Sequence, residues 1–186
     1  MPAPVNKHGY YPARGDANTL ARAIYAESLS NPEDFEAIGW AIANRVGTKE
    51  HGMTLNAVLH KRNQYEFLEV DGGPKGDSLL WNETADAGTL QGAKRTGWLH
   101  AKAVADGILG GTVADPTGGA TYFISSNKYV RGKPFTLESG FHRQLLTEGR
   151  FVDAPYISIS KRRRKSYFFI ESPEVSATPS REKTKT

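Results

Sequence analysis

The chain of 186 residues has no cysteine, which excludes a disulfide framework, thiolate catalysis and cysteine-ligated zinc. It also lacks an apolar run long enough to cross a membrane. The opening segment, MPAPVNKHGYYPARG, has no apolar core of the kind that a signal peptide carries. We therefore expect the protein to be made in the cytoplasm and, if it acts elsewhere, to be released or carried there by other means.

Motifs for metals and phosphates are missing as well. The histidines form neither an HExxH motif nor a close pair, and the glycines near residue 110 have no phosphate-binding lysine beside them. We predict no metal and no cofactor. The histidines are His8, His51, His60, His100 and His142.

Composition favours one globular domain, because 38% of the residues are hydrophobic and 24% are charged. We expect an N-terminal extension over residues 1–15 and a folded domain over 16–171. The segment 172–186 is polar and poor in apolar side chains, so we expect a disordered tail there.

The net charge of +4 lies entirely near the C-terminus, because the basic and acidic residues of 1–150 balance. Its centre is the run Lys161, Arg162, Arg163, Arg164 and Lys165. One interpretation is a solvated turn between two apolar stretches, and another is contact with an anionic envelope polymer. A specific nucleic-acid binder is disfavoured, since the rest of the chain shows no second basic stripe.

Most of the chain is predicted to be helical. We expect a helix over 16–29 and a second that begins at Asn31-Pro32 and ends near Gly47, with Phe35, Ile38, Ile42 and Val46 on one stripe. Shorter helices are expected over 55–61 and 79–87, a loop over 68–78, and a clearer helix over 98–109. After Gly111, glycine, proline and aromatic residues favour short strands.

The first helix carries an acid in an unusual place. Glu27 lies three and four residues beyond Ala23 and Ile24, which puts its side chain on or beside the face turned to the core. A desolvated carboxyl group tends toward a raised pKa and can then donate a proton near neutral pH. The alternative is an ordinary amphipathic helix with Glu27 at its boundary.

A second chemically suggestive stretch is Asp115-Pro-Thr-Gly-Gly-Ala-Thr-Tyr-Phe123. Asp-Pro opens a turn, and paired glycines permit positive φ and close approach of the backbone. The hydroxyl groups and rings that follow suit the polar edges and apolar faces of a sugar. The alternative is a structural turn that enters an edge strand.

Together these stretches resemble the SleB-type cell-wall hydrolases, which are lysozyme-like domains. The order and spacing of the matching motifs carry the resemblance. The motifs are Tyr25–Ser28, Ala41–Val46 and Asp115–Phe123, with a further match at Phe141-His142.

This resemblance implies a mostly helical α+β fold and cleavage of the peptidoglycan glycan strand, as a lytic transglycosylase or muramidase. Glu27 matches the family's catalytic acid, which protonates the glycosidic oxygen and then acts as a base on the C6 hydroxyl or on water. The first route needs no second carboxylate, and Glu36, Glu66, Asp71 and Asp115 have more ordinary interpretations as cap, loop or surface acids.

Further residues are implied to line the sugar cleft. Family members often carry Gln-Phe after the third helix, and here either Gln64-Tyr65 or Glu66-Phe67 is in register; we choose the first. Residues 70–97 have no clear equivalent and are interpreted as an insertion that forms one wall. The predicted binding residues are Gln64, Tyr65, Thr117, Gly118, Gly119, Tyr122 and His142.

Two questions stay open at this point. Without a signal peptide, the protein fits a phage endolysin, a lysin carried in a virion, or an effector injected by a secretion machine that acts in the periplasm. An alternative function is a non-catalytic virion structural or glycan-binding module. In that case Glu27 should be exposed or paired with Arg22.

Overall fold

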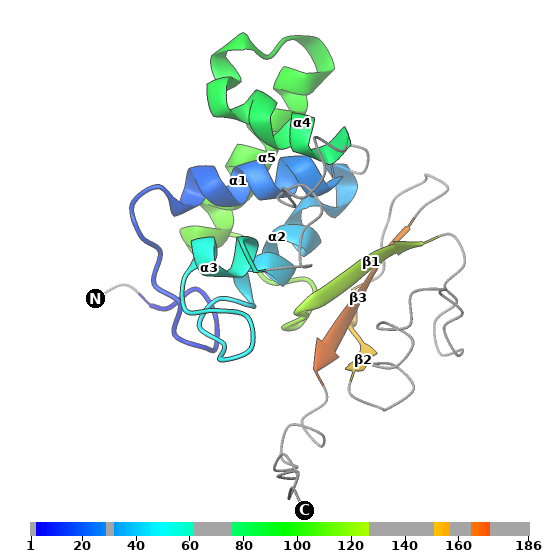
Figure 1. Ribbon diagram of the computed structural model, residues 1–186. Helices are drawn as coiled ribbons and strands as arrows, with labels where there is room; N and C mark the ends of the chain where they lie inside the picture. Colours follow the sequence, from blue (N-terminus) through cyan, green and yellow to red (C-terminus); the bar gives the residue numbers. More distant parts are fainter. Residues whose placement is uncertain (1–2, 29–31, 62–75, 127–150, 157–164, 172–186) are drawn as a thin grey trace, which may run out of the picture.

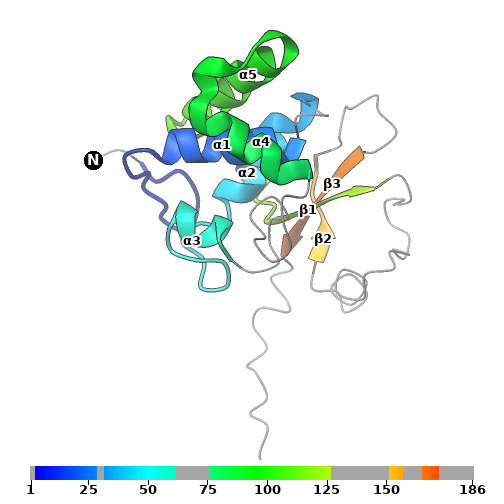
Figure 2. The ribbon, with the colours of Figure 1, turned by 45° about the horizontal axis from the view of Figure 1, so that its top comes forward.

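The computed structural model describes residues 3–28, 32–61, 76–126, 151–156 and 165–171. Its helices form one body, and a small antiparallel sheet lies beside them (Figures 1 and 2). The mostly helical α+β fold is therefore confirmed. In chain order the elements are α1 (Asp16–Ser28), η1 (Pro32–Asp34), α2 (Phe35–Ala43), α3 (Leu55–Leu59), α4 (Gly76–Glu83), η3 (Thr84–Thr89), α5 (Gly92–Leu109), β1 (Tyr122–Ser126), β2 (Phe151–Asp153) and β3 (Lys165–Glu171).

The helical core is built where α1, α2 and α5 pack together. The predicted stripe of α2, from Phe35 to Val46, is fully buried in this core. A Cβ at Gly39 would lie 2.6 Å from Ile108 Cδ1 and 2.8 Å from Ile24 Cδ1, so the missing side chain lets the three helices approach closely. Within the described part, no helix is long and apolar enough to span a membrane.

Several predicted boundaries were wrong. Residues 76–78, expected in a loop, are helical in α4, and the helix expected over 79–87 is split by a non-helical residue, Asp86. The helix expected from Trp98 begins already at Gly92. Its first turns were not predicted, because residues 92–96 are exposed and carry no apolar periodicity. The second helix ends at Ala43 rather than near Gly47, because the N–H groups of Arg45 and Val46 bond three residues back, to Ile42 and Ala43, as in turns.

The sheet has β3 at its centre, with β1 and β2 paired antiparallel on either side. Phe123 pairs with Phe168, and the ring of Phe168 is buried in the core shared with the helices. Tyr122 pairs with Phe169 on the opposite face, because neighbouring residues of a strand alternate. Lys165 of the predicted basic run begins β3, whereas 161–164 lie outside the described residues.

Residues of the predicted N-terminal extension pack against the end of α2. The buried Asn6 side chain donates to the carbonyl oxygens of Ala43 (2.7 Å) and Val46 (2.8 Å). Its Oδ1 accepts from the backbone N–H groups of His8 (3.0 Å) and Tyr10 (3.2 Å). One amide thus bonds to two carbonyl oxygens at the end of α2, of which that of Ala43 also accepts from the Val46 N–H (3.1 Å).

We expect Asn6→Ala to lower the free energy of unfolding by about 2–4 kcal/mol, because it leaves buried backbone groups without partners. Chemical denaturation followed by circular dichroism measures the loss. Asn18→Ala is the control, since Asn18 is exposed on α1, and it should change stability by less than about 0.5 kcal/mol. Equal stability of the two variants would refute this role of Asn6.

Candidate functional site

Glu27 lies in the last turn of α1, one of the three helices that build the core. Its neighbours Tyr25, Ala26 and Ser28 are buried, while Glu27 itself is half-buried. The side chain therefore stands at the margin of the core, as its helical spacing predicted. Loop residues 29–31, which follow, lie outside the described residues.

Arg22 does not pair with Glu27. Its guanidinium donates to the carbonyl oxygen of Trp81 (2.9 Å) and to Thr84 Oγ1 (3.2 Å), and it stacks 3.9 Å from the centroid of the Trp81 ring. These contacts attach α4 and η3 to α1. For a purely binding module, Glu27 was expected to be either exposed or paired with Arg22; the Arg22 guanidinium instead bonds to α4 and η3, and the binding module stays an alternative.

The predicted sugar-binding turn is organised by Asp115. This carboxylate accepts from the backbone N–H groups of Thr117 and Gly119 (both 2.8 Å) and from the Thr117 hydroxyl (2.6 Å). Gly118 and Gly119 have φ of 66° and 97°, a region that side chains with a Cβ rarely adopt. Asp115 is thus a structural cap, as predicted, and Thr117 is fully buried beneath the turn.

The end of α2 holds this turn in place. Asn44 Nδ2 donates to Asp115 Oδ2 (2.9 Å) and to the carbonyl oxygen of Ala120 (3.2 Å). The buried Arg45 side chain donates to the carbonyl oxygen of Thr121, and its guanidinium lies 5.1 Å from the Tyr122 ring centroid. Two motifs more than seventy residues apart in the sequence therefore form one unit.

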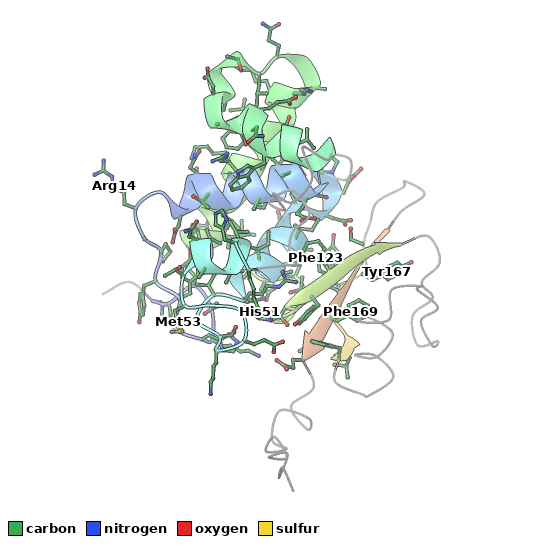
Figure 3. The ribbon with its side chains drawn as sticks, in the orientation of Figure 1. Arg14, His51, Met53, Phe123, Tyr167 and Phe169 are labelled. Atoms are coloured by element: carbon green, nitrogen blue, oxygen red, sulfur yellow. The ribbon has the colours of Figure 1, made fainter. Side chains whose placement is uncertain are left out.

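Tyr122 is buried on the face of β1 opposite Phe123. Its ring packs edge-on against His51 (5.3 Å between centroids) and Phe151 (4.3 Å), and its hydroxyl donates to Glu50 Oε1 (3.0 Å). Figure 3 labels His51, which precedes α3, and Phe123 of β1. Because neighbouring residues of a strand alternate, Tyr122 and Phe123 point to different faces of β1.

A pocket of about 440 Å³ opens beside the same turn. The sequence did not single out most of its residues, because they come from segments that meet only in the fold; the Asn-Arg-Val-Gly run at the end of α2 was the nearest signal. Glu27 is not among the described residues that line the pocket. These residues are Lys7, His8, residues 47–51, Gly119, Thr121, Ile170 and Glu171.

Comparison with protein families identifies the family to which this chain belongs. A model of the family described as Cell Wall Hydrolase matches residues 30–143, more than half of the chain. The chain belongs to the cell wall hydrolase family. The resemblance to SleB-type enzymes is thereby confirmed, and membership implies a hydrolase that acts on peptidoglycan. No curated protein and no solved structure matches the chain.

The family match includes both motifs that meet at Asn44 and Asp115, but it begins three residues after Glu27. The catalytic role of Glu27 therefore stays a prediction. Gln64, Tyr65 and His142, three of the predicted cleft residues of this cell wall hydrolase, lie outside the described residues. Within the described ranges no three acidic or histidine side chains gather as metal ligands would.

Proposed function

We propose that this cell wall hydrolase cuts the glycan strand of peptidoglycan, with Glu27 as its general acid and base. The observation that carries the proposal is the half-buried carboxyl group of Glu27 in the last turn of α1. Partial burial and the negative end of a helix dipole are general features that favour the protonated form of a carboxyl group. A protonated carboxyl group can donate to a leaving oxygen at neutral pH.

In this mechanism the sugar strand lies along the outer face of the turn, over Gly118 and Gly119, while the buried Thr117 supports the turn from beneath. Glu27 protonates the glycosidic oxygen as the bond to the anomeric carbon of the muramic acid residue breaks. The resulting carboxylate then removes a proton from the C6 hydroxyl of the same sugar, which closes a 1,6-anhydro ring, or from a water molecule. The first route needs no second catalytic acid, because the attacking hydroxyl belongs to the substrate.

The rigid support of the turn suits this role. Asp115, Asn44 and Arg45 fix its backbone through hydrogen bonds that need no substrate. A preformed surface binds a sugar strand with less loss of conformational entropy than a surface that must order on binding. Tyr122 is held by Phe151 of β2 and by Glu50 of the segment before α3, so it can support the turn without moving.

Mass spectrometry of purified sacculi digested with the protein tests the proposal. We expect muropeptides that end in 1,6-anhydro-muramic acid from a lytic transglycosylase, or in reducing muramic acid from a muramidase. Products cut only in the peptide would contradict glycan cleavage. Binding to sacculi without any product would instead favour the non-catalytic glycan-binding module.

A further inference from the structure

Two lysines line the pocket beside Gly119 and take no part in the polar contacts that stabilise the described part of the fold. Lys7 and Lys49 are both exposed, and neither makes a hydrogen bond or ion pair with the described residues. The four segments that line the pocket bring both lysines to its wall. Two such groups attract an anion more strongly than either does alone.

Unlike the two lysines, the acids of the pocket, Glu50 and Glu171, already interact with other side chains of the pocket or its floor. Glu50 Oε1 accepts the Tyr122 hydroxyl, and the charge of Glu171 acts on His8. Partial burial and the neighbouring Lys7 lower the pKa of His8, which favours its neutral form. The pocket thus presents positive and negative groups side by side, which suits a ligand with both a carboxylate and an amine.

The geometry joins this pocket to the proposed sugar-binding turn. A Cβ built on Gly119 would lie 3.7 Å from Lys7 Nζ, so the ammonium group reaches the backbone at the end of that turn. Thr121, two residues later, also lines the pocket, and its buried hydroxyl has no hydrogen-bond partner in the described part of the chain. A strand bound along the turn would therefore have its substituents at the mouth of the pocket.

We propose that this pocket binds the peptide stem of the peptidoglycan strand, with a stem carboxylate between Lys7 and Lys49. The inference rests on the proposed function, since it assumes a glycan strand along residues 117–119. The stem hangs from muramic acid and carries both free carboxylates and a free amine. The carboxylates pair with the lysines, and Glu50 and Glu171 face the amine.

Titration with a soluble stem tripeptide, L-alanyl-D-glutamyl-diaminopimelate, tests this pocket without requiring cleavage. In heteronuclear NMR we expect the amide signals of Gly119 and Thr121 to shift. Lys7→Met/Lys49→Met should weaken binding roughly tenfold, because two charge-assisted contacts are lost. The same peptide with amidated carboxylates should bind the parent protein as weakly as the unmodified peptide binds this variant.

Lys94→Met/Lys102→Met is the matched control, because it removes the same charge from two lysines on α5, the exposed Lys94 and the half-buried Lys102. It should bind the tripeptide like the parent protein. Equal weakening in both double variants, or equal affinity for free and amidated peptide, would overturn the inference. Peptide binding by a protein that leaves sacculi uncut would instead refute the proposed function and leave the pocket assignment standing.

Discussion

Glu27→Gln should reduce cleavage of the glycan strand by roughly 10²–10⁴-fold or more, while folding and binding to sacculi persist. Glutamine keeps the shape of the side chain and most of its hydrogen-bonding capacity, but it has no proton to transfer. Release of soluble muropeptides from purified sacculi measures the rate, and sedimentation with sacculi measures binding. Stability should hold or rise slightly, since acids placed for catalysis often cost stability.

Glu36→Gln is the control for this experiment, because Glu36 is exposed on α2, and its activity should stay close to that of the parent protein. Asp34 of η1, two residues earlier, is unsuitable as a second control, because it is fully buried and accepts the hydroxyl of Tyr156 (3.0 Å). A fully active Glu27→Gln protein would refute the assignment of the general acid.

Asp115→Ala should lower the free energy of unfolding by about 2–4 kcal/mol and strongly reduce cleavage. The substitution removes the acceptor of four hydrogen bonds, three of them from Thr117 and Gly119 and one from Asn44. Without them the glycine turn loses the contact that sets its path. Urea denaturation measures the loss, provided that the slope of the transition is unchanged.

Two further substitutions make this test specific. Asp115→Asn keeps one acceptor oxygen for Thr117, but its amide nitrogen cannot accept from Gly119 or Asn44, so we expect an intermediate loss. Asp106→Ala removes an exposed acid whose side chain pairs only weakly with Lys102 on the same helix, and it should cost less than about 0.5 kcal/mol. If Asp115→Ala were as mild as Asp106→Ala, the turn would not depend on this carboxylate.

Local patterns were sufficient to predict the helices that build the body of the molecule. The stripe from Phe35 to Val46 is buried as its spacing required, and α1 ends with Glu27 at the margin of the core. Such predictions work because a helical period places residues on one face whatever the rest of the chain does. They fail where the helix is exposed, as in the first turns of α5, since no apolar residue marks them.

The residues that hold the candidate site together could not be read from local patterns. Asn6, Asn44 and Arg45 act through hydrogen bonds to segments roughly forty to seventy-six residues away, and no periodicity encodes such partners. The same is true of Lys7 and Lys49, which line one pocket with Gly119 because the N-terminal segment folds back on the end of α2. The motifs thus predicted the class of chemistry, while long-range packing places the groups that support the turn and create the pocket beside it.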